Sequence, residues 1–175
     1  MIHPQYWSLY SIWCKLRGIP PCVLERYDIE AYLKLPLENA VVLDIGAYNG
    51  DTAELFLKHG ARRVICIEPD QKLCLELERK HLPNVEVRCR GFNEHDLEDT
   101  LWTCCKMDCE GYEALLYERG WHKHIQGRPV VLEAHNWHIK EELEKIGFRT
   151  IKVLNPMLGL TLMANFSTVN NKKGD

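Results

Sequence analysis

The sequence predicts one α/β domain, in which a mostly parallel sheet is covered by helices on both faces and ends with an antiparallel strand. Between residues 40 and 147, short apolar runs alternate with segments of helical periodicity, the pattern of parallel strands joined by crossover helices. The last two apolar runs, 148–156 and 160–166, follow each other with no helix between them. Such a pair predicts an antiparallel hairpin. The length of 175 residues suits one domain.

The N-terminal residues 1–37 predict a short helical extension. Tyr6, Leu9, Tyr10 and Trp13 have helical spacing before Gly18. A second helix is expected over 24–35, ending before Pro36. Two interpretations stay open: a cap or lid over the main domain, or an accessory helix pair that only covers the sheet.

The main domain is expected to span 38–169. Continuous apolar runs are typical of strands buried on both faces, and they predict parallel strands at 40–46, 62–70, 84–92, 102–108 and 128–135. Intervening segments predict helices at 51–60, 71–82, 112–120 and 137–147. The polar stretch 93–100 is expected to be a short helix or a loop. Residues 170–175 predict a disordered tail.

Composition indicates an ordinary globular protein. The chain is 46% hydrophobic and 27% charged, with a formal net charge of −3, which disfavours a protein that coats nucleic acid. It has no apolar run long enough for a membrane span and no visible secretory signal. A cytoplasmic location is therefore expected. The eight cysteines include no Cys-x-x-Cys pair, which favours buried, reduced thiols over disulfides or a zinc site.

The stretch VVLDIGAYNGDTA, which begins at Val41, predicts a ligand-binding turn between a strand and a helix. Asp44 ends the strand, and Gly46 and Gly50 allow the backbone to bend tightly. In open α/β sheets, ligands bind at the carboxyl ends of the strands. The glycine spacing differs from Gly-x-Gly-x-x-Gly and thus disfavours a dinucleotide dehydrogenase. Because Asp44 would repel a phosphate, the spacing and the charge together favour a ligand with a cationic group.

A second carboxylate follows at the end of the next predicted strand. Glu68 lies 24 positions after Asp44, and an acid at that place accepts hydrogen bonds from ribose hydroxyls in nucleoside-binding sheets. Together the two acids suggest a nucleoside with a cationic, amino-acid-like arm. S-adenosyl-L-methionine fits that description.

Three stretches carry a family resemblance: VVLDIGAYNGDTA, VICIEPD and CKMDCEGYEALL. With them the chain resembles the FkbM-type class I S-adenosylmethionine-dependent methyltransferases over about residues 38–135. The resemblance implies a three-layer, Rossmann-like, seven-stranded sheet whose last strand is antiparallel. It also implies methyl transfer to a hydroxyl of a small molecule or sugar, and a set of residues that bind the cofactor. The cofactor-binding residues would be Asp44, Gly46, Ala47, Asn49, Gly50, Thr52, Glu68, Pro69, Asp70, Gly91, Phe92 and Asp108.

Methyl transfer requires alignment of the acceptor and, for a hydroxyl, removal of its proton. Asp108 ends the predicted strand 102–108, Glu110 follows it, and His135 ends the strand 128–135. We expect these three residues to be catalytic: Asp108 in the pocket, Glu110 to orient or deprotonate the acceptor, and His135 as a general base. The alternatives are that Glu110 only favours a helix N-terminus and that His135 only completes its strand.

A metal site is a less favoured interpretation of the same region. Its candidate ligands are His122, His124, His135, His138, Glu110 and Glu133. Histidines on loops are commonly exposed without a metal, so we expect no metal site.

Alternative functions remain. The acceptor could be RNA or protein, with Arg62, Arg63, Arg88 and Arg90 as local basic groups. The domain could also bind S-adenosylmethionine without catalysis. The expected partner is a small-molecule acceptor rather than nucleic acid or a membrane. The aromatic N-terminal segment is a candidate surface for a homodimer.

Overall fold

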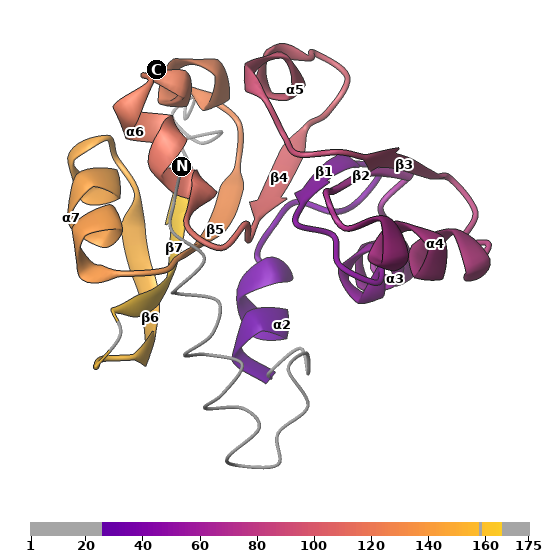
Figure 1. The fold of residues 1–175 in the computed structure, drawn as a ribbon, viewed down its shortest axis with the longest axis horizontal. Coiled ribbons are helices and arrows are strands. Elements are labelled where there is room, and N and C mark those ends of the chain that lie inside the picture. The colour runs from indigo at the N-terminus through magenta and orange to yellow at the C-terminus, as the bar shows by residue number, and fades with distance from the viewer. Residues whose placement is uncertain (1–25, 158, 166–175) are drawn as a thin grey trace, which may run out of the picture.

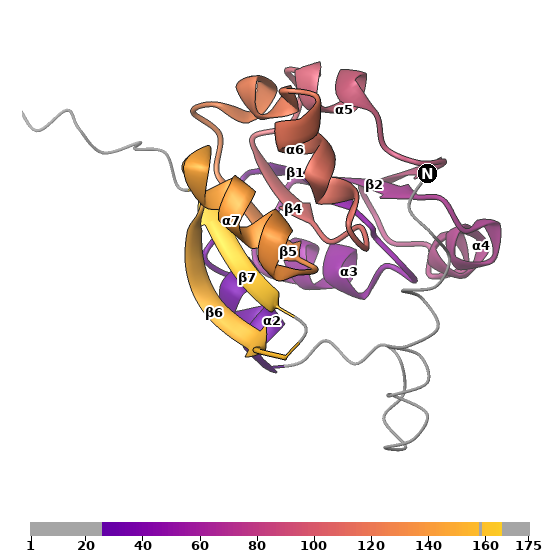
Figure 2. The same ribbon diagram turned by 60° about the vertical axis from the view of Figure 1, so that its left-hand side comes forward.

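The computed structural model describes residues 26–157 and 159–165 and shows one seven-stranded sheet (Figure 1). The strand order is β3-β2-β1-β4-β5-β7-β6. Strands β1 to β5 are parallel, and β7 lies antiparallel between β5 and β6. The predicted fold class is confirmed, including the closing hairpin, which Figure 2 shows at one edge. The helix expected before Gly18 and the tail 170–175 lie outside the described residues.

All seven strands form within the predicted apolar runs, each slightly shorter than its run. They are β1 Val41–Ile45, β2 Arg63–Glu68, β3 Val85–Cys89, β4 Cys104–Met107, β5 Val130–Ala134, β6 Arg149–Asn155 and β7 Leu160–Asn165. Every residue of β1 and β4 is buried. The runs are continuous rather than alternating because helices cover both faces of these strands.

The helices also follow the predicted order. They are α2 Arg26–Tyr32, α3 Asp51–Lys58, α4 Gln71–Arg79, α5 Glu94–Glu98, α6 Leu115–Glu118 and α7 Trp137–Lys145. The helix expected over 112–120 is instead a 3₁₀ turn, η1 Tyr112–Ala114, followed by the short α6. A second 3₁₀ turn, η2 Trp121–Ile125, was not predicted. Left-handed glycines Gly111 and Gly120 precede the two turns and interrupt regular helix there.

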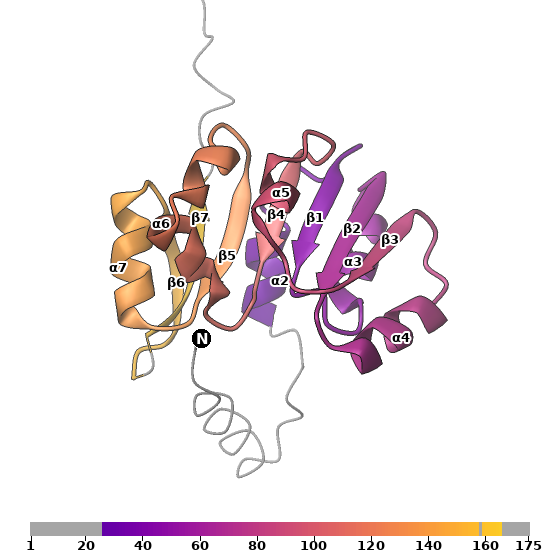
Figure 3. The ribbon, with the colours of Figure 1, turned by 45° about the horizontal axis from the view of Figure 1, so that its top comes forward.

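Two apolar clusters hold the helices on the sheet. On one face, Leu43 and Ile45 of β1 pack with residues of α5, α6 and α7; on the other, Val42 packs with α2, α3 and α4. Figure 3 shows α5, α6 and α7 on one side of the sheet and α2 and α3 on the other. Neighbouring residues of a strand point to opposite faces, so Asp44 lies on the same face as Val42, toward α3.

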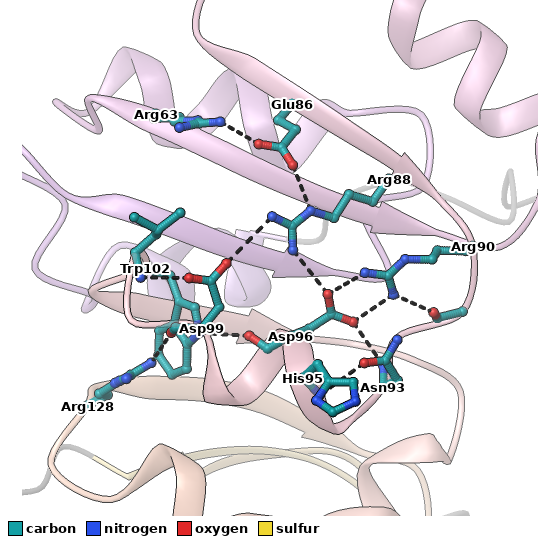
Figure 4. A network of polar contacts seen from close by, with 12 residues as sticks. Arg63, Glu86, Arg88, Arg90, Asn93, His95, Asp96, Asp99, Trp102 and Arg128 are labelled. Atoms are coloured by element: carbon teal, nitrogen blue, oxygen red, sulfur yellow. Dashed lines mark hydrogen bonds and ion pairs between the residues drawn. The ribbon is translucent and has the colours of Figure 1, made fainter.

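The polar stretch 93–100 forms α5, with a capping box between Asn93 and Asp96. Asp96 is buried and accepts hydrogen bonds from Arg88 (3.1 Å) and from Arg90 (2.5 and 2.7 Å). Arg88 also bonds Glu86, which pairs with Arg63 (Figure 4). The basic residues considered as an RNA surface are thus partly engaged: Arg63, Arg88 and Arg90 bond acids of the chain.

The expectation that all cysteines are reduced is wrong for one pair. Cys74 and Cys89 form a disulfide, with their Cα atoms 5.8 Å apart. Cys74 lies on α4, directly after β2, and Cys89 ends β3, opposite Glu68 of β2. The parallel crossover therefore brings together two residues 15 positions apart, without a Cys-x-x-Cys motif. The expectation holds for Cys66, Cys104 and Cys105, which are free and buried.

Within residues 26–157 and 159–165, no helix has the length and apolar character that crossing a membrane requires.

We expect Asp96→Asn to destabilise the protein by about 2 kcal/mol at pH 7, because two guanidinium groups lose their shared charged acceptor. Burial alone would raise the pKa of Asp96, but the Arg90 hydrogen bond, with Asn93 and Arg88, lowers it overall. The contribution is therefore present above the unfolded-state pKa of about 3.9 and is lost as the pH falls through the lower native pKa. Urea denaturation at pH 7, 5 and 3 measures it.

Asp99→Asn is the matched control. Asp99 lies 3.6 Å from Arg88, and its other oxygen accepts the N–H of Leu101, a bond that asparagine retains. We expect a loss below about 1 kcal/mol. Equal losses in both variants would contradict the role given to Asp96.

Candidate active site

The glycine turn joins β1 to α3 and packs closely against the end of β4. Gly46 has φ +74°, and a Cβ there would stand 1.7 Å from the carbonyl oxygen of Asp108. Gly50 has φ +88°, and a Cβ there would meet the Leu77 side chain at 2.8 Å. Both glycines are thus required by contacts within the chain itself. The close contact at Gly46 brings the turn directly beside Asp108.

Asp44 is fully buried under this turn and has partners from the chain. Its carboxylate accepts a 2.5 Å hydrogen bond from the Thr52 hydroxyl and lies 3.2 Å from the Nζ of Lys106. Lys106, equally buried, also donates to the carbonyl oxygen of Gly46 at 2.6 Å. Burial alone would lower the pKa of Lys106, but the charge of Asp44 raises it, so the ammonium stays protonated.

This pair changes the interpretation of the acid. From the sequence, Asp44 is expected to face a cationic ligand, whereas in the structure the ammonium of Lys106 lies beside it. Direct contact of Asp44 with a ligand stays a prediction. Lys106 is a residue that sequence reasoning missed. The sequence signal is a lysine within an otherwise apolar run; only the register of β1 with β4 shows that it faces Asp44.

Glu68 closes the other side of the turn. Its carboxylate accepts backbone N–H groups of Tyr48 (2.9 Å) and Asp70 (2.9 Å), and the residue is 6% exposed. Two lone pairs of a carboxylate remain after two such bonds. Glu68 therefore joins the end of β2 to the glycine turn and keeps capacity for further hydrogen bonds.

The other residues predicted to bind a cofactor lie in different settings. Ala47 is buried, and Asn49 accepts the N–H of Asp51 at 3.3 Å. Pro69 is exposed, and Asp70 caps α4 through Lys72 and Leu73.

Beyond β3, Gly91 is exposed, and a Cβ there would meet no atom of the described chain within 4 Å. Phe92 packs edge-on against Trp121, with ring centroids 5.7 Å apart. Gly91 therefore borders open space, whereas Phe92 serves the core under α5 and η2.

The three residues predicted to be catalytic come together at the ends of β4 and β5. The Nε2 atom of His135 lies 3.5 Å from Asp108 Oδ1 and 3.6 Å from Glu110 Oε2. Glu110 is exposed and has φ +55°, a strained conformation for a non-glycine residue, such as is often found at functional sites.

A fourth residue, Glu113, orients the histidine. It is fully buried, and its Oε1 accepts from the His135 ring Nδ1 at 2.5 Å and from the His135 backbone N–H at 3.1 Å. Glu113 is not among the residues that the sequence predicts for the site, although it lies within the stretch CKMDCEGYEALL. Its second oxygen, Oε2, accepts the backbone N–H of the left-handed Gly111 at 2.9 Å.

The charges of this cluster determine the protonation states of His135 and Glu110. Burial alone would lower the pKa of His135, but the charge and hydrogen bond of Glu113 raise it well above its usual value. The Glu110 side chain is 52% exposed, yet the atoms packed around its carboxylate reduce its hydration and raise its pKa, against the opposing charge of His135. His135 is therefore a cation near neutral pH, and Glu110 is the better proton acceptor.

Two groups in the described chain have the residue types and spacing of a metal site. Donor atoms of Asp108, Glu133 and His135 lie within 4.8 Å of one another, as do those of Glu94, Glu98 and His124. The first group includes two of the predicted catalytic residues. Of the earlier candidate ligands, His122 instead contacts the carbonyl oxygen of Leu116 through Nδ1 at 2.9 Å, and His138 packs edge-on against Tyr117.

Known structures share this fold. No protein-family model matches the chain, and no curated protein matches its sequence. The ribosomal protein L11 methylase from Lactobacillus delbrueckii subsp. bulgaricus has a TM-score of 0.61 and 12% identity, over 82% of this chain and 79% of that one.

Two further known structures are similar in fold to this chain. An rRNA methylase from Streptococcus thermophilus has a TM-score of 0.56 and 12% identity, over 82% and 97% of the two chains. A structure of SMU.776 complexed with SAH has a TM-score of 0.57 and 10% identity, over 82% of this chain and 49% of that one. At these identities the likeness shows the fold, which is that of class I S-adenosylmethionine-dependent methyltransferases.

We expect Gly46→Ala to cost roughly 3 kcal/mol or more, because left-handed strain and a clash with the β4 backbone add together. Gly120→Ala is the matched control: Gly120 has φ +67°, and a Cβ there would meet no described atom within 4 Å. It should lose only about 1 kcal/mol. Urea denaturation compares them, and similar losses would contradict the tight contact at Gly46.

Lys106→Met should cost about 3 kcal/mol, because it leaves the Asp44 carboxylate buried without its cation. The double variant Asp44→Asn, Lys106→Met should recover a large part of that loss, since no buried charge remains. A double-mutant cycle in urea measures the coupling. Additive losses would show that the two residues do not act as a pair.

Proposed function

We propose that the chain is a methyltransferase that binds S-adenosylmethionine and transfers its methyl group to a hydroxyl of a small-molecule acceptor. The observation that carries this proposal is the contact of Asp108, Glu110 and His135 directly beside the glycine turn. The fold supports it, as does the resemblance of the three sequence stretches to the FkbM-type enzymes.

The residues around the turn fit the cofactor. Glu68 has remaining acceptor capacity for ribose hydroxyls. Gly91 borders open space after β3, where an adenine ring would lie. Because Lys106 already neutralises Asp44, we assign the amino-acid end of the cofactor to Asp108, whose side chain is 31% exposed. When bound, the cofactor supplies an activated methyl group on a sulfonium.

The chemical step needs alignment and a proton acceptor. The acceptor oxygen forms a bond to the methyl carbon while the carbon–sulfur bond breaks, and its electron pair stays on sulfur. The hydroxyl proton passes to the Glu110 carboxylate, whose raised pKa suits a base. His135 is protonated and less suited to the base role that the sequence suggested; its positive charge lies 3.5 Å from Asp108 and 3.6 Å from Glu110 and attracts both carboxylates.

The charge of the site favours an acceptor without phosphates near the reacting hydroxyl. Four acids, Asp108, Glu110, Glu113 and Glu133, lie at or beside one histidine. Such a site repels phosphodiesters and suits a polyhydroxylated or neutral molecule. This argument supports a small-molecule acceptor over RNA.

An RNA or protein acceptor is the second candidate. Similar folds occur in a ribosomal protein methylase and an rRNA methylase, so both substrate types belong in the assay. Incubation of the chain with radiolabelled S-adenosylmethionine and fractionated cell extract separates the cases by the fraction that gains label. Cofactor binding without label in any fraction would favour a non-catalytic binding module.

Calorimetric titration should detect binding of S-adenosylmethionine and S-adenosylhomocysteine but not of NAD. Glu68→Gln should weaken binding about tenfold, because an amide replaces one of the acceptor oxygens that hold the turn and the ribose. Glu76→Gln, the same change at an exposed position of α4, is the matched control. Binding of NAD without a response to S-adenosylmethionine would refute the proposed cofactor.

A further inference from the structure

A compact set of metal-ligating side chains lies at the ends of β4 and β5. Asp108, Glu133 and His135 each offer a donor atom, and these atoms all lie within 4.8 Å of one another. We propose that Asp108, Glu133 and His135 bind one divalent metal ion of the Mn²⁺ or Zn²⁺ type. A mixture of one imidazole and two carboxylates is a donor set that such ions accept.

The orientation of His135 fits a ligand. Its ring Nδ1 lies 2.5 Å from an oxygen of the buried Glu113, so the Nδ1–H donates to that carboxylate. The opposite nitrogen, Nε2, faces Asp108 and Glu110, and the incoming ion displaces its proton to solvent when it binds. Metal-binding histidines in proteins are commonly held in this way, with the second ring nitrogen bonded to a carboxylate. Glu113 thus acts as a positioning residue rather than a ligand.

The spacing of the donor atoms also fits. Two ligands at about 2.1 Å from one ion are separated by roughly 3.0 Å in octahedral and roughly 3.4 Å in tetrahedral geometry. Nε2 of His135 lies 3.5 Å from Asp108 Oδ1 and 3.6 Å from Glu110 Oε2. These distances are too long for strong direct hydrogen bonds. The distance to Asp108 matches two atoms that share an ion, whereas Glu110 lies outside the three-residue group and keeps its role as the proton acceptor.

The second group consists of Glu94, Glu98 and His124. It differs from the first in how the histidine ring is bonded and in the spacing of the donor atoms. Nε2 of His124 lies only 2.8 Å from Glu94 Oε1, a direct bond that uses the donor nitrogen. Lys123 lies 3.7 Å from the same carboxylate oxygen and supplies a cation of the chain. This group has the same residue types without the open spacing, so it is a natural control.

The role of the ion rests on the proposed methyl transfer. A divalent ion beside the glycine turn would polarise the acceptor hydroxyl and favour its deprotonation. It would also offset the repulsion among the carboxylates that surround His135. Binding of the ion itself is independent of that role and can be measured with the metal alone.

The test uses the full chain, stripped with EDTA, dialysed and titrated with MnCl₂ while electron paramagnetic resonance measures free Mn²⁺. We expect one site per chain. Asp108→Asn and Glu133→Gln should each weaken it at least about tenfold, and Glu113→Gln about tenfold through the orientation of His135. Glu94→Gln should leave the affinity unchanged. Zn²⁺ should compete with Mn²⁺ for the same site.

Three outcomes would overturn the site: no saturable Mn²⁺ binding, binding that the Asp108 and Glu133 variants leave unchanged, or binding that Glu94→Gln abolishes. Circular dichroism and thermal unfolding verify that each variant is folded. If Glu113→Gln does not fold, Asp108→Asn still tests the site, because the Asp108 side chain is only half-buried and its substitution disturbs the core less. Titration of the stripped chain with S-adenosylmethionine separates the two proposals, because cofactor binding without metal binding refutes only the metal site.

Discussion

The buried pair of Asp44 and Lys106 is the interaction on which the rest of this structure depends. The two residues lie opposite each other on the central strands β1 and β4, 3.2 Å apart and shielded from water. Because Lys106 also bonds the carbonyl oxygen of Gly46, the pair fixes the glycine turn where it leaves the sheet. A charge removed from water requires its partner, so this turn has little freedom to adopt another conformation.

The turn in turn determines the geometry of the candidate site. Gly46 packs on the backbone of Asp108, and Glu68 holds the turn from the β2 side through Tyr48. The ends of three parallel strands are thereby locked into one edge. On the far side of Asp108, the hydrogen bond between Glu113 and His135 fixes the end of β5. The edge therefore combines a rigid turn with a cluster of acids around one oriented imidazole, which is an arrangement suited to a cationic group.

Much of this could be predicted from local sequence. Strands and helices follow from apolar periodicity, and the convergence of Asp108, Glu110 and His135 follows from the rule that parallel strands end at one edge. The partners of buried charges were not predictable in the same way. Lys106 and Glu113 are recognised as partners only once register and burial are known, and the Cys74–Cys89 disulfide depends on how α4 crosses from β2 to β3.

By itself, the sequence determined the order and type of elements, the closing hairpin and the edge of the sheet where chemistry-bearing residues gather. Those features depend on local periodicity and on the handedness of parallel crossovers, which neighbouring residues encode. Only the tertiary structure decided which charge faces which. Lys106 lies 3.2 Å from the buried Asp44 carboxylate, and Glu113 holds the His135 ring through Nδ1. Electrostatic partners are set by distances of a few ångströms across strands far apart in the chain, and no local pattern specifies such distances.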